Sequence, residues 1–146
     1  MPGTEDSLLL DRQLCFPLYA AARQIVAAYT PLLRPLGLTY TQYLVFLALW
    51  EEDGQTVGAL CRRLRLDSGT LTPLLKRLEA DGRVCRTRSP QDERSVVVTL
   101  TDAGRALKRQ ALGIPERAAA CVPLTPEEAV TLYTILYKML DRGGAE

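Results

Sequence analysis

Residues 66–84 read "LDSGTLTPLLKRLEADGRV", and residues 92–104 read "DERSVVVTLTDAG". Asp67 is placed to cap a helix with leucines at helical spacing, and Gly82 is placed to end it. Two strands, 84–88 and 95–100, then flank the polar loop "SPQDER". With a further short helix capped by Thr56, this order predicts a winged helix-turn-helix over residues 55–110. The fold class is thus mainly α with a small β ribbon.

The helix after Asp67 is expected to bury one face and expose the other. Its core face carries Leu71, Leu74, Leu75 and Leu78. At about 100° per residue, Gly69, Pro73 and Lys76 point away from these leucines. Thr72 and Arg77 flank the outer face, where hydroxyls and cations suit phosphates and base edges. This face is a candidate for contact with DNA.

The ribbon adds cations of its own. Arg86 and Arg88 precede a loop that ends in Arg94, and a cation at a loop tip suits a narrow minor groove. Residues 56–109 carry twelve Lys/Arg and six Asp/Glu, a net charge of +6, whereas the two flanks together carry −5. Charged faces are usually only solvated faces. Here the ribbon and the local positive charge coincide with the helix-turn-helix, which favours double-stranded DNA as a partner.

The rest of the composition bounds the class of protein. A chain of 146 residues with 47% apolar and 24% charged residues is typical of one globular domain, 1–146. No uncharged run reaches the roughly 18 residues that a membrane span needs, and the first residues carry acids rather than the basic start of a secretory signal. We therefore expect a cytoplasmic protein that does not enter a membrane.

Histidine is absent, which excludes imidazole-based catalysis and imidazole metal sites. The four cysteines, at positions 15, 61, 85 and 121, are too far apart in sequence for a CxxC motif. We expect four free thiols in a reducing compartment, no metal, no cofactor and no enzymatic activity. Cys61 and Cys85 are interpreted as packing residues.

The flanking segments, 8–50 and 111–146, are expected to form a helical dimerisation region. Asp11 is placed to cap a helix that ends before Pro31, with either a kink or a later start at Pro17. Thr39 or Thr41 opens the next helix, and Thr125 caps the last one. The first and last helices carry more apolar surface than a domain of this size can cover, which predicts a homodimer.

Cys15 raises a separate question, because a free cysteine is most often a small, inert core residue. In the first turn of a helix, with Arg12 one turn earlier, its thiolate is expected to be favoured. A thiolate so placed can attack a peroxide and become a sulfenic acid. Spacing alone favours the inert thiol and leaves both readings open.

The chain resembles a known family in several of these motifs. Residues 66–84 and 92–104 resemble the recognition helix and wing of MarR-type repressors. With "QLCFPLY" (13–19) and "LTYTQYLVFLALWE" (38–51), residues 8 to 110 resemble the organic-hydroperoxide-sensing OhrR branch. The resemblance implies a homodimer on a pseudopalindromic operator, with an organic hydroperoxide as the signal. It also implies DNA contacts by Ser68, Thr70, Thr72, Lys76 and Arg77, and a wing tip in which Asp92 orients Arg94.

The same resemblance assigns Cys15 as the peroxide sensor. Tyr29 and Tyr40 match positions whose hydroxyls, from the partner subunit, support the thiolate, and Tyr19 is a weaker third. One-cysteine members of this branch use an external thiol, whereas two-cysteine members form a disulfide between subunits. Cys121, just before the last helix, matches the second cysteine of such a disulfide. Two other functions stay open: a MarR-type regulator that responds to a small aromatic ligand with Cys15 inert, and a thiol peroxidase. The basic helix-turn-helix argues against the peroxidase.

Overall fold

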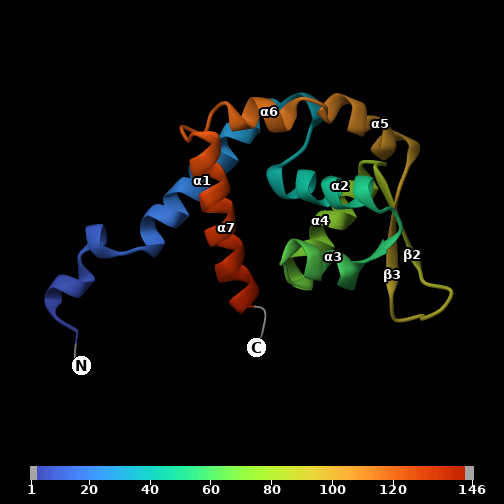
Figure 1. The fold of residues 1–146 in the computed structure, drawn as a ribbon. Helices are drawn as coiled ribbons and strands as arrows, with labels where there is room; N and C mark the ends of the chain where they lie inside the picture. Colours follow the sequence, from blue (N-terminus) through green and yellow to red (C-terminus); the bar gives the residue numbers. More distant parts are fainter. Residues whose placement is uncertain (1–2, 144–146) are drawn as a thin grey trace.

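The computed structural model describes residues 3–143, which form a winged head on a helical support (Figure 1). The ends of the expected domain 1–146 and segment 111–146 therefore lie outside the described residues. The support consists of α1 (Cys15–Leu33), α6 (Ile114–Ala119) and α7 (Pro126–Gly143). The head contains α2 (Tyr40–Glu51), β1 (Gln55–Thr56), α3 (Val57–Leu64), α4 (Ser68–Ala80), β2 (Val84–Arg88), β3 (Val96–Leu100) and α5 (Asp102–Ala111).

The helix starts of the head follow local capping chemistry. The Thr56 hydroxyl accepts a hydrogen bond from the Ala59 N–H at 3.0 Å, and the Asp67 carboxylate accepts one from the Thr70 N–H at 2.7 Å. Thr39, rather than Thr41, caps α2 in a reciprocal capping box with Gln42. The predicted helix-turn-helix is confirmed. Gly82, two residues after the end of α4, has a positive φ of 73° and turns the chain out of the helix.

The ribbon is part of a three-stranded antiparallel sheet in the order β1–β3–β2. β2 pairs with β3 from Val84 opposite Leu100 to Arg88 opposite Val96. The short strand β1 was not expected from the sequence, because two residues are too few to show a periodicity. Its pairing with β3 holds the start of α3 against the base of the wing.

The core lies between α2, α3, α4 and the sheet. Its largest fully buried side chains include Phe46, Leu49, Leu60, Leu71, Leu75 and Leu78. Leu74, expected in the same buried stripe, is only half-buried and packs at the edge of this core. Three of the four predicted leucines of α4 are therefore core residues, which fixes the outer face of the helix.

The first helix differs from the prediction. Asp11 lies in a separate 3-10 turn, Leu10–Arg12, and α1 begins at Cys15. A helix capped by Asp11 would need an N–H from Pro17, whereas a start at Cys15 places Pro17 in the first turn, where that N–H is not used. The helix also continues past Pro31 to Leu33, because the fully buried Leu33 side chain anchors its last turn in the core.

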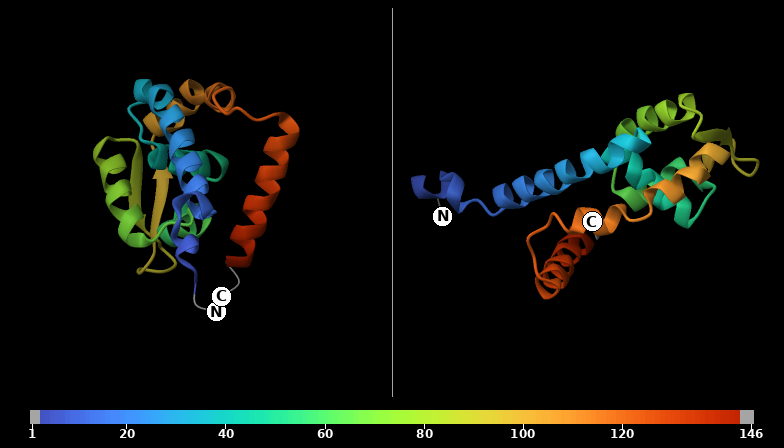
Figure 2. Two further views of the ribbon diagram at one scale, coloured as in Figure 1. Left: turned by 90° about the vertical axis from the view of Figure 1, so that its left-hand side faces the viewer. Right: turned by 90° about the horizontal axis from the view of Figure 1, so that it is seen from above.

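The support projects away from the head. The N-terminal segment and the start of α1 extend beyond the rest of the fold (Figure 2), and α7 is separated from the head over most of its length but meets Arg65 near its C-terminal end. Large apolar side chains remain exposed on both helices, among them Leu14, Phe16, Tyr133, Ile135 and Met139. None of the helices within residues 3–143 combines the length and the apolar character needed to cross a bilayer.

Candidate DNA interface and redox site

The outer face of α4 presents the predicted DNA-binding side chains. Ser68, Thr70, Lys76 and Arg77 are exposed, and Thr72 is half-buried. Thr70 and Arg77 also line a shallow groove of about 310 Å³ that reaches Thr39 and Thr41 at the start of α2. One edge of this face therefore lies beside the start of α2.

A second cleft, of about 500 Å³, brings three of the predicted residues together. Thr72 from α4, Arg86 from β2 and Arg94 from the wing loop all line it. The cleft is also lined by Arg62 of α3, which is one of the twelve Lys/Arg of residues 56–109 and was not among the predicted DNA-binding residues. The sequence feature that could have identified Arg62 is its position on the helix before the turn.

Arg86 is held in place by Glu79 of α4. The Glu79 carboxylate accepts hydrogen bonds from the Arg86 N–H at 3.1 Å and from Arg86 Nη2 at 3.2 Å. These bonds to the guanidinium and the main chain hold the pKa of Glu79 below its ordinary value of 4.5. One acidic side chain thus ties the recognition helix to the wing strand and orients a predicted DNA-binding cation.

The wing loop is shaped by its own polar side chains. The Asp92 carboxylate accepts from the Arg94 N–H at 3.0 Å and from Ser95 Oγ at 3.2 Å. Arg88 Nη1 donates to the Glu93 carbonyl at 3.0 Å. The expected link between Asp92 and Arg94 is present, but it runs through the main chain of Arg94, so that Asp92 fixes the turn and leaves the guanidinium exposed.

Cys15 is exposed and is the first residue of α1, at the positive end of the helix dipole. Leu14 precedes it, and no side chain caps the helix. The expected neighbour Arg12 instead pairs with Asp6, with Nη1 3.6 Å from Oδ2. The helix start, rather than Arg12, is therefore the electrostatic feature beside this thiol.

Tyr29 and Tyr40 pack against each other with ring centroids 5.0 Å apart. Tyr43 was missed from the sequence and completes the cluster, 5.7 Å from Tyr29 and 6.4 Å from Tyr40. Burial, followed by the neighbouring Tyr29, raises the pKa of both Tyr40 and Tyr43. The spacing of Tyr40 and Tyr43, three residues apart on a helix, was the signal for this cluster. Their hydroxyls stay protonated at neutral pH and can donate hydrogen bonds.

The structure does not bring Cys15 to this cluster within one chain. Cys15 and Tyr29 are fourteen residues apart on α1, which corresponds to about 21 Å of helix rise. Tyr19, one turn after Cys15, is exposed, and the Arg23 guanidinium lies 5.5 Å from its ring centroid.

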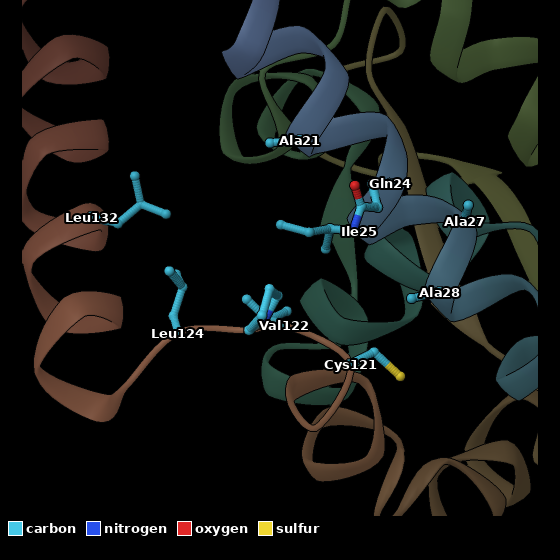
Figure 3. Close-up of a pocket in the computed structure, with 10 residues that line it drawn as sticks. Ala21, Gln24, Ile25, Ala27, Ala28, Cys121, Val122, Leu124 and Leu132 are labelled. Carbon is cyan, nitrogen blue, oxygen red and sulfur yellow. The ribbon is translucent and has the colours of Figure 1, made fainter.

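Cys121 lies on an apolar cavity of about 610 Å³ between α1, α7 and the segment that joins α6 to α7 (Figure 3). Its thiol is exposed and lies 3.6 Å from the Arg117 carbonyl. The part of α1 that lines the cavity starts at Ala21, six residues or about 9 Å of helix rise beyond Cys15. Cys15 is not among the lining residues, so the two cysteines are separated within one chain.

The other two thiols differ from each other. Cys61 is half-buried against the core, as predicted. The prediction that Cys85 is a packing residue is wrong: it is exposed, because alternation along β2 turns Val84 inward and Cys85 outward. Residues 3–143 contain no cluster of three or more acidic or cysteine side chains suited to a metal ion.

Comparisons with known proteins agree with this architecture. A family model described as "Transcriptional regulator SarA/Rot" matches residues 27–111. The organic hydroperoxide resistance transcriptional regulator of Bacillus subtilis is 45% identical over 141 residues, which cover 97% of this chain and 96% of that protein.

Two solved structures of AbfR, in different oxidation states, are also similar. The overoxidized AbfR bound to DNA is 38% identical, with a TM-score of 0.76 over 94% of this chain and 97% of that one. The disulfide-formed AbfR is 38% identical, with a TM-score of 0.66 over 94% of each chain. With the winged head, the helical support and the exposed thiol at the start of α1, these matches show that the chain belongs to the organic-hydroperoxide-resistance branch of the MarR-type transcriptional regulators.

Proposed function

We propose that this protein is a homodimeric DNA-binding repressor that releases its operator when an organic hydroperoxide oxidises Cys15. The observation that carries the proposal is the exposed Cys15 thiol at the positive end of α1, on the helical support of a winged head. Oxidation of a thiol in the support can change the relative position of the two winged heads of a dimer. The names of the B. subtilis regulator and of the AbfR structures support the same assignment.

The first chemical step is nucleophilic attack by the Cys15 thiolate on the terminal peroxide oxygen. The S–O bond forms as the O–O bond breaks, the alkoxide leaving group takes a proton from solvent and departs as the alcohol, and the thiolate becomes a sulfenic acid. Tyr29 of the partner subunit and Tyr40 of the partner subunit donate hydrogen bonds to the thiolate, with Tyr19 as a weaker contributor. Contact across the subunits is required because Tyr29 of the same chain lies about 21 Å away along α1.

The second step joins the subunits. The thiol of Cys121 attacks the sulfenic sulfur, water leaves, and an intersubunit disulfide forms. A disulfide requires Cα atoms within about 7 Å. Both cysteines belong to the support that sets the spacing of the two heads, so closing the bond moves the heads against a fixed half-site spacing of about 34–36 Å.

On the operator, α4 enters the major groove and the wing lies over the minor groove. The proposed major-groove contacts are Ser68, Thr70, Thr72, Lys76 and Arg77. Arg94 reads the minor groove from a turn shaped by Asp92, and Arg86 and Arg88 contact the backbone beside it. These positions are supported by the exposure of the α4 face and by the shared cleft of Thr72, Arg86 and Arg94.

The test compares operator binding before and after one equivalent of cumene hydroperoxide, measured by fluorescence anisotropy on the promoter duplex of the protein's own gene. Wild type is expected to bind when reduced and to lose at least tenfold in affinity, about 1.4 kcal/mol, after oxidation. Cys15→Ser is expected to bind equally well and to ignore the peroxide. An undiminished peroxide response in Cys15→Ser would contradict the assignment of the sensor.

A second candidate function is regulation by a small aromatic ligand with Cys15 inert. One observation favours it, a cavity of about 200 Å³ lined by Tyr43, Trp50 and Lys108. Its aromatic walls suit a small aromatic ligand, and its two charged lining residues, Lys108 and Glu116, are of opposite sign, so that Lys108 is the partner for an acid group on that ligand. This function predicts that wild type and Cys15→Ser respond alike, to an aromatic acid such as salicylate and not to the peroxide.

A further inference from the structure

We propose that the cleft between α3, α4 and the wing is a binding site for one phosphodiester group of DNA, with Arg62 as its positioning residue. The proposal rests on the DNA binding proposed above, and adds a contact from the helix before the turn. It makes Arg62 a backbone anchor that sets the register of α4 on the duplex.

The lining of this cleft is suited to an anion. Three guanidinium side chains and three hydroxyl side chains line it, and its remaining lining residues are apolar or glycine, without any acid. The six polar members are Arg62, Arg86, Arg94, Thr56, Thr72 and Ser95. Arginines match the oxygens of a phosphate in a bidentate manner, and hydroxyls donate to the oxygens that remain.

The first turn of α3 forms one wall. Thr56 caps this helix by accepting from the Ala59 N–H, but the N–H groups of Val57 and Gly58 precede the first helical hydrogen bonds. Both residues line the cleft. The start of a helix attracts anions, and here the helix start and the guanidinium groups face the same space.

Arg62 lies over that same turn. A methyl group placed on Gly58 would lie 3.6 Å from Arg62 Nη1, so the guanidinium reaches back one turn toward the helix start. Its sequence neighbour Arg63 behaves differently, because it pairs with Glu51 of α2. Two adjacent arginines on one helix therefore have different surroundings, one in the cleft and one in an ion pair.

The opposite wall is held rigidly. Arg86 is fixed by its two hydrogen bonds to Glu79, and β1 pairs with β3 so that the start of α3 cannot drift from the base of the wing. Arg94 approaches from the wing loop. A phosphate in this cleft would thus be bound by side chains from α3, α4 and the wing. Such a contact does not depend on the base sequence, but it can orient both α4 and the wing on the duplex.

The experiment uses a fluorescein-labelled 30-base-pair duplex of random sequence, since phosphate contacts dominate non-specific binding. Affinity is measured between about 50 and 200 mM NaCl for the reduced wild type, Arg62→Ala, Arg62→Lys and the control Arg63→Ala. Arg62→Ala is expected to bind roughly three- to tenfold more weakly and to lower the slope of log K against log salt by about one. Arg62→Lys keeps the slope, and Arg63→Ala matches wild type.

The outcomes separate this proposal from the proposed function. If wild type binds the duplex while Arg62→Ala retains both its affinity and its salt slope, the phosphate site is wrong and DNA binding stands. Equal losses in Arg62→Ala and Arg63→Ala would also overturn it, because the effect would then be general charge. Thermal melts check folding, and Arg62→Gln replaces Arg62→Ala if the alanine variant is unfolded.

Discussion

At the scale of single residues, exposure and position separate the four thiols. Cys61 is packed against the core, whereas Cys15, Cys85 and Cys121 are exposed. Cys15 is the one that begins a helix, and Cys121 is the one beside an apolar cavity of the support. Cys85 lies on the wing strand, away from the support, and so provides a matched exposed thiol for comparison.

This comparison leads to a test of the resolving cysteine. After treatment with cumene hydroperoxide, Cys121→Ser is expected to remain a single-chain band on non-reducing electrophoresis, although Cys15 still forms a sulfenic acid that a dimedone probe can label. Cys85→Ser is expected to crosslink as wild type does. A subunit-linked band that persists in Cys121→Ser would assign the second sulfur of the disulfide to another cysteine.

At the scale of elements, one ion pair connects the recognition helix to the wing. Glu79 and Arg86 bring α4 and β2 together, with side chains that are 39% and 21% exposed. The pKa of Glu79 is lowered mainly by its hydrogen bonds to Arg86. The ionised carboxylate is therefore what stabilises this junction, and protonation removes that contribution.

The pH dependence follows with a definite sign. The folded-state pKa of Glu79 lies below 4.5, so its stabilising contribution is complete above pH 4.5 and is lost as the pH falls through the lowered value. Glu79→Gln is expected to lower the melting temperature at pH 7 and to differ less from wild type near pH 3. Calorimetry at both pH values checks this, with the exposed wing residue Glu93→Gln as control. A pH-independent difference would contradict it.

At the scale of the whole molecule, α7 runs from the segment that contains Cys121 to the winged head. It begins shortly after Cys121, and near its other end Arg65 contacts it, with Nη1 3.4 Å from the Leu140 carbonyl and Nη2 3.8 Å from Asp141 Oδ1. Arg65 occupies the turn between α3 and α4 with a φ of 55°. This contact joins the end of α7 to the turn that precedes the recognition helix.

The exposed apolar faces of the support predict the assembly. Ile135 is 50% exposed and lies on a helix whose described side chains include no fully buried one. Packing across a two-fold axis would cover such a face. Ile135→Glu is expected to halve the mass found by light scattering at micromolar concentration and to weaken operator binding, whereas Gln110→Glu on the exposed side of α5 leaves the mass unchanged. A monomeric wild type would rule out the dimer.

The sequence by itself determined the features that depend on contacts within one turn of chain. The sequence predicted the caps at Thr56, Asp67 and Thr125 and the leucine spacing of α4, because each involves residues three or four apart. The winged helix-turn-helix and its outer face followed from them, and the cysteine and tyrosine motifs indicated the redox branch.

Only the tertiary structure decided the features that depend on distant partners. The extension of α1 past Pro31 depends on the Leu33 side chain, which is fully buried in the core of the head. Strand β1 exists because Thr56 pairs with Val97, 41 residues later. The cleft that contains Arg62 is formed by three consecutive elements between residues 56 and 96, and local periodicity carries no information about how such elements meet in space.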